Sequence, residues 1–64
     1  MREITLNNLA MMMEKPVMTV LAQASMADAI LKKKDAPNIY IDLDKYETYL
    51  EKLIEEELKA VNNY

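Results

Sequence analysis

Polar and apolar residues alternate at the start of the chain and then recur at helical spacing. Residues 2–6 alternate with a period of two, which predicts a short strand or an extended arm. Asn7 or Asn8 can cap a helix, and good helix formers follow, so we expect a first helix to about residue 15. Pro16 disfavours helical geometry at the residue before it and suits the first turn of a second helix, which we expect to end near residue 26 or 27.

The middle of the chain has the pattern of a β-hairpin. Two short apolar runs, residues 29–31 and 39–41, flank a polar connector that contains Asp35, Pro37 and Asn38. The second run, Ile-Tyr-Ile, is β-branched and aromatic, which makes it the most strand-like triplet in the sequence.

The last third of the sequence predicts one long amphipathic helix over residues 45–61. Asp44, followed three residues later by Glu47, resembles a capping box, in which each side chain bonds a free backbone amide of the first turn. Apolar residues then recur at intervals of three and four along one stripe: Tyr46, Tyr49, Leu50, Leu53, Ile54, Leu58 and Val61. Together these elements predict an α+β fold with short N-terminal helices, a β-hairpin and a long C-terminal helix.

Composition changes this picture in two ways. A chain of 64 residues without cysteine has only a marginal core, yet 52% of its residues are hydrophobic, so we expect a homodimer or a chain completed by a partner. The sequence also lacks histidine and glycine, which excludes His- or Cys-based catalysis, Cys/His zinc sites and glycine-rich phosphate loops. We therefore predict a protein that is not an enzyme, with no cofactor.

Two further negative expectations follow from the sequence. Asp42 and Asp44 lie two residues apart, but this segment supplies too few oxygens for a cation, so we expect no metal. The longest apolar run near the N-terminus, residues 9–13, is far too short to span a membrane, so we expect no membrane partner and a cytoplasmic location.

Charge is distributed unevenly along the chain. Residues 1–43 hold five acidic and five basic residues, whereas residues 44–64 hold six acidic and three basic residues, so the net charge of −3 belongs to the terminal segment. The one basic cluster, Lys32, Lys33 and Lys34, would present three ammonium groups at the hairpin turn, which suits contact with DNA phosphates. A solvated loop that protects an edge strand explains the same cluster without DNA.

Two apolar sets each allow two interpretations. The methionines at positions 11, 12, 13, 18 and 26 could form an adaptable recognition surface, but we expect them chiefly to fill the core, and they would also suit a dimer seam. The stripe of the last helix could cover the chain's own sheet or lie in a groove of another protein. Both hold if the first turns pack on the hairpin while the last turns and Tyr64 reach outward.

The order of helix, strand, turn, strand and acidic helix resembles the Phd/YefM antitoxins of bacterial type II toxin–antitoxin modules. In that family the second strand is typically followed by a small polar residue, a Leu, an acid, a variable residue and a Tyr or Phe. Residues 42–46, Asp-Leu-Asp-Lys-Tyr, follow this order, and the resemblance covers about residues 4–58. It implies a dimer that binds operator DNA through its N-terminal region and a toxin through a C-terminal segment that folds as it binds.

The resemblance implies that Arg2 belongs to a DNA-contacting arm, to which we add Lys32, Lys33 and Lys34. We expect residues 1–43 to dimerise and bind DNA, and residues 44–64 to bind a partner. The partner-binding residues would be Tyr49, Leu50, Leu53, Ile54, Leu58, Val61 and Tyr64. Two alternatives use the same elements: an excisionase-like winged helix whose recognition helix is residues 16–26, and a small phage or host inhibitor that binds a protein without DNA.

Overall fold

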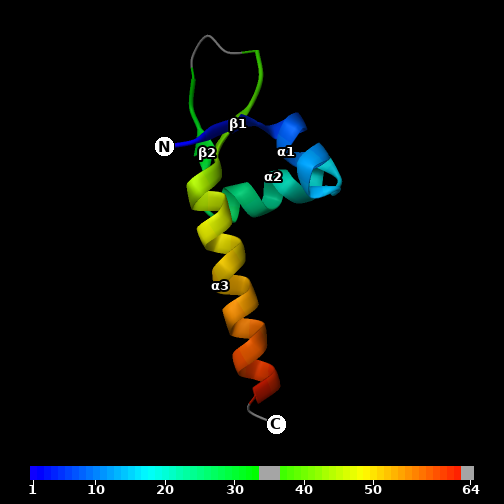
Figure 1. Cartoon of the computed structure of the whole chain (residues 1–64). Coiled ribbons are helices and arrows are strands. Elements are labelled where there is room, and N and C mark those ends of the chain that lie inside the picture. Colours follow the sequence, from blue (N-terminus) through cyan, green and yellow to red (C-terminus); the bar gives the residue numbers. More distant parts are fainter. Residues whose placement is uncertain (34–36, 63–64) are drawn as a thin grey trace.

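The computed structural model of the chain describes residues 1–33 and 37–62 (Figure 1). Its elements are β1 (Glu3–Thr5), α1 (Leu6–Met13), α2 (Val17–Met26), β2 (Ile30–Leu31), β3 (Tyr40–Asp42) and α3 (Leu43–Asn62). The predicted α+β fold is confirmed. Helix α3 extends away from the other elements, which gives the molecule extents of 50 × 21 × 16 Å. Within the described ranges, no helix combines the length and the apolar character that crossing a bilayer needs.

The sheet is antiparallel, and β3 is its central strand in the order β1-β3-β2. Ile41 of β3 lies opposite Ile4 on one side and opposite Ile30 on the other. The predicted hairpin of β2 and β3 is confirmed, and residues 34–36 of its connector lie outside the described residues. The alternating N-terminal segment is a strand, because β3 offers it a pairing edge.

The core lies where the sheet, α1, α2 and the first turns of α3 meet. Leu6, Leu9 and Ala10 give α1 one inward stripe, while Val20 and Ala24 do the same for α2. The core is completed by Ala29 directly before β2, Ile41 of β3 and Tyr46 of α3.

Most of the methionines lie outside this core. Met13 packs against it, but Met11, Met12, Met18 and Met26 are exposed. The expectation that methionines chiefly fill the core is therefore wrong for these four. The physical reason is that leucine, valine and alanine already occupy the inward faces of both short helices, so the methionine positions between them point outward.

Helix α1 begins earlier than predicted, because Thr5 caps it. The backbone of Thr5 is extended, and its Oγ1 accepts a hydrogen bond from the amide of Asn8 at 3.2 Å. This is the usual arrangement at a helix N-terminus. The prediction that Asn7 or Asn8 caps the helix is wrong, since both lie inside α1.

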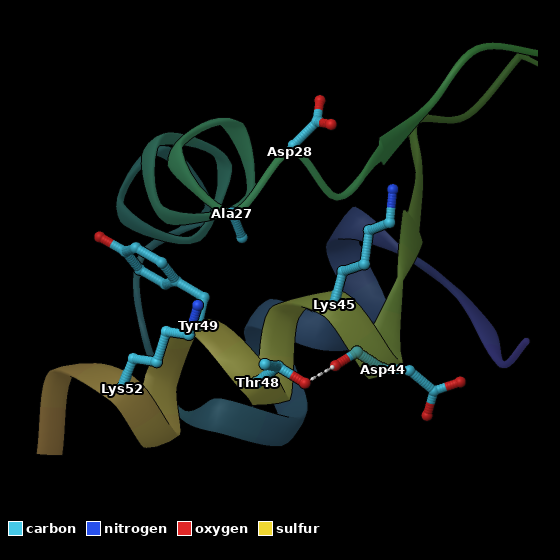
Figure 2. Close-up of a pocket in the computed structure, with 7 residues that line it drawn as sticks. All are labelled: Ala27, Asp28, Asp44, Lys45, Thr48, Tyr49 and Lys52. Atoms are coloured by element: carbon cyan, nitrogen blue, oxygen red, sulfur yellow. Dashed lines mark hydrogen bonds between the residues drawn. The ribbon is translucent and has the colours of Figure 1, made fainter. Parts of the chain in front are cut away.

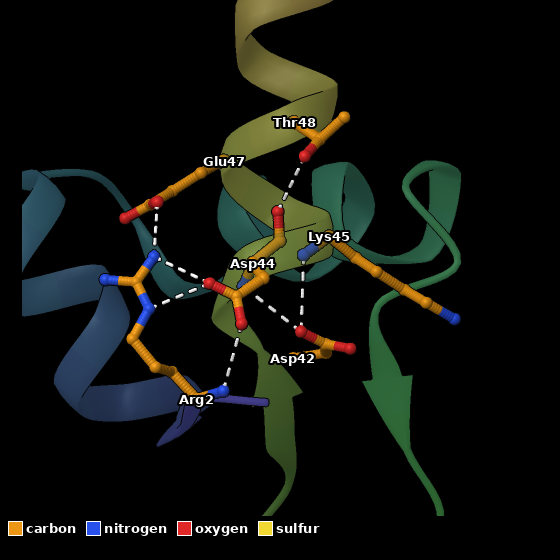
Figure 3. Close-up of polar contacts among 6 residues, drawn as sticks. All are labelled: Arg2, Asp42, Asp44, Lys45, Glu47 and Thr48. Carbon is orange, nitrogen blue, oxygen red and sulfur yellow. Dashed lines mark hydrogen bonds and ion pairs between the residues drawn. The ribbon is translucent and has the colours of Figure 1, made fainter.

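Helix α3 also begins earlier, at Leu43, because Asp42 caps it (Figure 3). One carboxylate oxygen of Asp42 accepts hydrogen bonds from the amides of Asp44 at 3.1 Å and Lys45 at 3.2 Å. The predicted capping box of Asp44 and Glu47 is wrong, because both of those side chains bind Arg2 instead.

A left-handed residue follows each of the helices α1 and α2, although the chain contains no glycine. These residues are Glu14, with φ of 55°, and Asp28, with φ of 53°. After each helix two successive amides donate to carbonyls of the last turn: Glu14 to Met11 and Lys15 to Ala10, then Asp28 to Ser25 and Ala29 to Ala24. This is the Schellman motif, in which glycine is the usual left-handed residue.

Candidate functional site

Two tyrosines hold the first turns of α3 against the rest of the chain. The side chain of Tyr46 is fully buried, and its hydroxyl donates to Oε1 of Gln23 in α2 at 2.7 Å. Burial, with a smaller effect of the nearby Tyr49, raises the pKa of Tyr46, because the ionised phenol would lose its hydration. The hydroxyl of Tyr49 lies 3.7 Å from Sδ of Met26. The start of the predicted stripe thus covers the chain's own body.

Farther along, the apolar stripe leaves that body, as Figure 1 shows for the end of α3. Leu50 and Leu53 are half-buried, whereas Ile54 is 57%, Leu58 57% and Val61 66% exposed. We call these last three side chains the free stripe. Tyr64, which we also predicted to bind a partner, lies outside the described residues.

One acidic residue lies within the free stripe and was absent from the predicted partner-binding set. Glu57 follows Leu53 by four residues and precedes Val61 by four, so it shares their face of α3, and it is exposed. Its position on this face could have been read from spacing alone. A carboxylate among apolar side chains needs a cation or hydrogen-bond donors when that face is covered.

Arg2 connects the N-terminal segment to the start of α3 (Figure 3). Its Nε donates to Oδ1 of Asp44 at 2.8 Å, its Nη2 to Oε2 of Glu47 at 2.5 Å, and its backbone amide to Oδ2 of Asp44 at 3.1 Å. The side-chain hydrogen bond from Arg2 holds the pKa of Asp44 below its usual range, and the two carboxylates raise the pKa of Arg2. A DNA phosphate would have to displace both carboxylates to bind this guanidinium.

The predicted basic cluster follows β2, and one of its members already has an acidic neighbour. Nζ of Lys33 lies 2.7 Å from Oε2 of Glu3 and 4.6 Å from the centroid of the Tyr40 ring, which is a cation–π distance. Lys32 is exposed, and Lys34 lies outside the described residues. A phosphate that binds Lys33 or Arg2 would therefore have to compete with the acidic partners of these side chains.

An open groove of about 410 Å³ lies beside the root of α3 (Figure 2). Charges of both signs line it, together with the Thr48 hydroxyl, which donates to the carbonyl of Asp44 at 2.9 Å. The full lining is Ala27, Asp28, Asp44, Lys45, Thr48, Tyr49 and Lys52. Over residues 1–33 and 37–62, no three acidic side chains come close enough together to hold a metal ion. The groove therefore offers hydrogen bonds and charge to a ligand.

The five residues that carry the family resemblance form the junction between β3 and α3. Asp42 caps the helix, Leu43 begins it, Asp44 binds Arg2 and Tyr46 enters the core. Asp42, Asp44 and Tyr46 thus each have a structural reason for their residue type. The chain matches no protein-family model, no curated protein and no solved structure, so the resemblance to the Phd/YefM antitoxins stays a prediction.

Proposed function

We propose that the chain is a small antitoxin-like regulator that acts in the cytoplasm, binds a protein toxin through α3 and contacts operator DNA as a dimer. The observation that carries this proposal is the free stripe, an apolar helix face that extends past the body of the protein and is exposed in the single chain. The element order α2, β2, β3, α3 that underlies the family resemblance adds support.

The size of the free stripe shows what the partner must add. Fully burying a Val, Leu or Ile side chain contributes about 1.5–3 kcal/mol, so covering three side chains that are more than half exposed contributes roughly 3–5 kcal/mol. Micromolar binding needs about 8 kcal/mol. The half-buried part of the stripe and the polar groups beside it must therefore take part.

The charges around the free stripe indicate a basic partner groove. Glu57 lies on the stripe itself, and Glu47, Glu51 and Glu55 lie toward one side of it by helical spacing. The lysines of α3, spaced seven residues apart at positions 45, 52 and 59, lie on the face of the helix opposite the free stripe. A groove with an apolar floor would cover the free stripe, and an Arg or Lys in that groove would pair with the carboxylate of Glu57.

Calorimetric titration of the full chain against the purified product of each adjacent gene tests partner binding. We expect one product to arrest growth when expressed alone and to be neutralised by this chain. Glu57→Gln should weaken that complex at least about tenfold, because the cation opposite it would be left unpaired. The matched control is Glu56→Gln, which changes a neighbouring carboxylate off the stripe and should alter affinity by about twofold or less.

Removal of residues 52–64 should abolish toxin neutralisation while any DNA binding stays. The proposed role of α3 is wrong if the shortened chain still neutralises the toxin, or if both activities disappear together while the body stays folded by circular dichroism.

DNA binding is tested by fluorescence anisotropy with the duplex upstream of the gene over a series of salt concentrations. The logarithm of the affinity falls linearly with the logarithm of the salt concentration, and the magnitude of this salt slope decreases by about one for each phosphate contact that is lost. We expect Lys32→Ala to reduce the slope in this way, because Lys32 is exposed. Lys59→Ala, on α3, is the matched control and should leave the slope unchanged. A chain without salt-dependent affinity near physiological ionic strength refutes the DNA part of the proposal.

The structure favours these roles over the winged-helix alternative. Helix α2, which would be the recognition helix, carries no charged residue, and its Gln23 accepts the Tyr46 hydroxyl instead of pointing to base edges. If DNA binding fails while α3 still binds its partner, the chain is a protein inhibitor without a DNA function.

A further inference from the structure

A long segment of this chain is almost free of charge although much of it lies on the surface. The chain has 8 basic and 11 acidic residues, but only Glu14 and Lys15 fall within residues 6–27, which comprise α1, α2 and their connection. Soluble surfaces are normally about a quarter to a third charged. The buried centres of protein interfaces, in contrast, are depleted of charge and enriched in methionine.

Several apolar side chains of this segment are exposed. Met11 is 77% and Met18 73% exposed, and Val17 is 39% exposed. Met11 and Val17 line one open depression of about 630 Å³, together with both charged residues of the segment, Glu14 and Lys15. We call Met11, Glu14, Lys15 and Val17 the α1–α2 face.

We propose that the α1–α2 face binds the same face of a second copy of this chain around a twofold axis. In such an interface each contact occurs twice, so Glu14 of one copy can pair with Lys15 of the other and the reverse. One acid beside one base makes the face neutral and complementary to itself. A standard interface takes about 800 Å² from each partner, about a sixth of the 5027 Å² surface of this chain, so both helices must contribute.

The charge on the free stripe of α3 also favours the α1–α2 face as the dimer interface. The free stripe of α3 contains Glu57 and has further acids toward one side, so two copies of α3 placed face to face would bring carboxylates together. The α1–α2 face has no such conflict. Nor does it hold an excess of Lys and Arg that would attract a nucleic acid or an anionic membrane. The two apolar surfaces therefore suit different partners, a second copy for α1–α2 and another protein for α3.

The proposed function requires a dimer, and this inference identifies the surface through which the dimer forms. It rests on the proposed function only through that requirement. Neither DNA nor the partner of α3 is needed to test it. Sedimentation equilibrium of the full chain alone, over a range of concentrations, measures the mass directly, and a dimer has twice the 7.4 kDa of the chain. Circular dichroism checks that every variant is folded.

Met11→Lys places an ammonium group on the α1–α2 face of each copy and should weaken dimerisation about a hundredfold. Leu58→Lys makes the same kind of change at an exposed position of α3 and should leave the dimer affinity within about threefold. Lys15→Glu removes the reciprocal pairing and should also weaken the dimer. The double variant Glu14→Lys with Lys15→Glu should restore it, because the exchanged face is again complementary to itself.

The proposal is overturned if the chain is monomeric at all concentrations, if Met11→Lys dimerises like the unmodified chain, or if Leu58→Lys is the variant that dissociates. Failure of the double variant to recover the dimer affinity that Lys15→Glu removes overturns it as well. A monomeric chain that sediments with phosphatidylcholine vesicles, and is released by Met11→Lys, would show that the face binds lipid instead.

Discussion

The left-handed residue after α1 leads to a prediction about stability. Glu14 has φ of 55° and occupies the position in a Schellman motif at which glycine is usual. Its amide and that of Lys15 donate to the carbonyls of Met11 and Ala10, so the motif requires this backbone conformation. We expect Glu14→Gly to raise the free energy of unfolding, since glycine adopts this conformation without a clash at Cβ.

The expected gain is the difference between two opposing effects. A side chain other than glycine in the left-handed region costs about 1–2 kcal/mol, because Cβ approaches the following carbonyl oxygen. Glycine loses more backbone entropy on folding, which costs about 0.5–1 kcal/mol. The net stabilisation is therefore roughly 0.5–1 kcal/mol, which corresponds to a rise of about 3–6 °C in the thermal midpoint of so small a domain.

Thermal and urea unfolding, followed by circular dichroism at one fixed protein concentration, measure this change. The matched control is Glu14→Ala, which removes the same carboxylate but keeps Cβ, so any effect of the missing charge on stability or dimerisation is common to both variants. The glycine variant should therefore be more stable than the alanine variant by the same amount, roughly 0.5–1 kcal/mol. Equal stabilities of the two variants, or a lower stability for glycine, would refute the argument from backbone conformation.

Three further predictions concern the root and the tip of α3. Tyr46→Phe leaves Oε1 of Gln23 without its buried donor and should lower the free energy of unfolding in urea by about 1–3 kcal/mol. Since Arg2 lowers the pKa of Asp44, this carboxylate stabilises the fold above the ordinary carboxyl pKa of about 4, and the contribution is lost as the pH falls through the lowered pKa. Thermal midpoints should therefore fall more steeply with acid for the unmodified chain than for Arg2→Gln. Leu58→Lys should change the thermal midpoint of the free chain by less than the equivalent of about 0.5 kcal/mol, because the side chain is already exposed; a larger loss would mean that α3 packs against something in the free chain.

The elements of the fold follow from the sequence because each has a strong local pattern. The three-and-four spacing after Tyr46 predicted α3, and the β-branched run before Asp42 predicted β3. Their exact starts did not follow, because the choice of cap depends on distant residues. Asp44 is as good a capping residue as Asp42 in isolation, but in the folded chain its carboxylate binds Arg2, which is 42 residues away in sequence.

The candidate site was predictable only in part for the same reason. Spacing identified the apolar stripe of α3, but only the fold shows that Tyr46 is buried while Leu58 is exposed, because this depends on where α3 leaves the body. Glu57 could have been assigned to that face from spacing alone. The pairing of Lys33 with Glu3 was not predictable, since it requires β1 and β2 to lie on either side of β3.

The place of β3 at the centre of the sheet also determines when the protein can fold during its synthesis. Chains grow from the N-terminus at about 5–20 residues per second. When residues 6–27 have just been made, β1 has no strand to pair with, because its partner is residues 40–42. Helices α1 and α2 therefore emerge before the sheet that covers their inward stripes, and both faces of these helices stay accessible to chaperones or to other nascent chains until β3 follows.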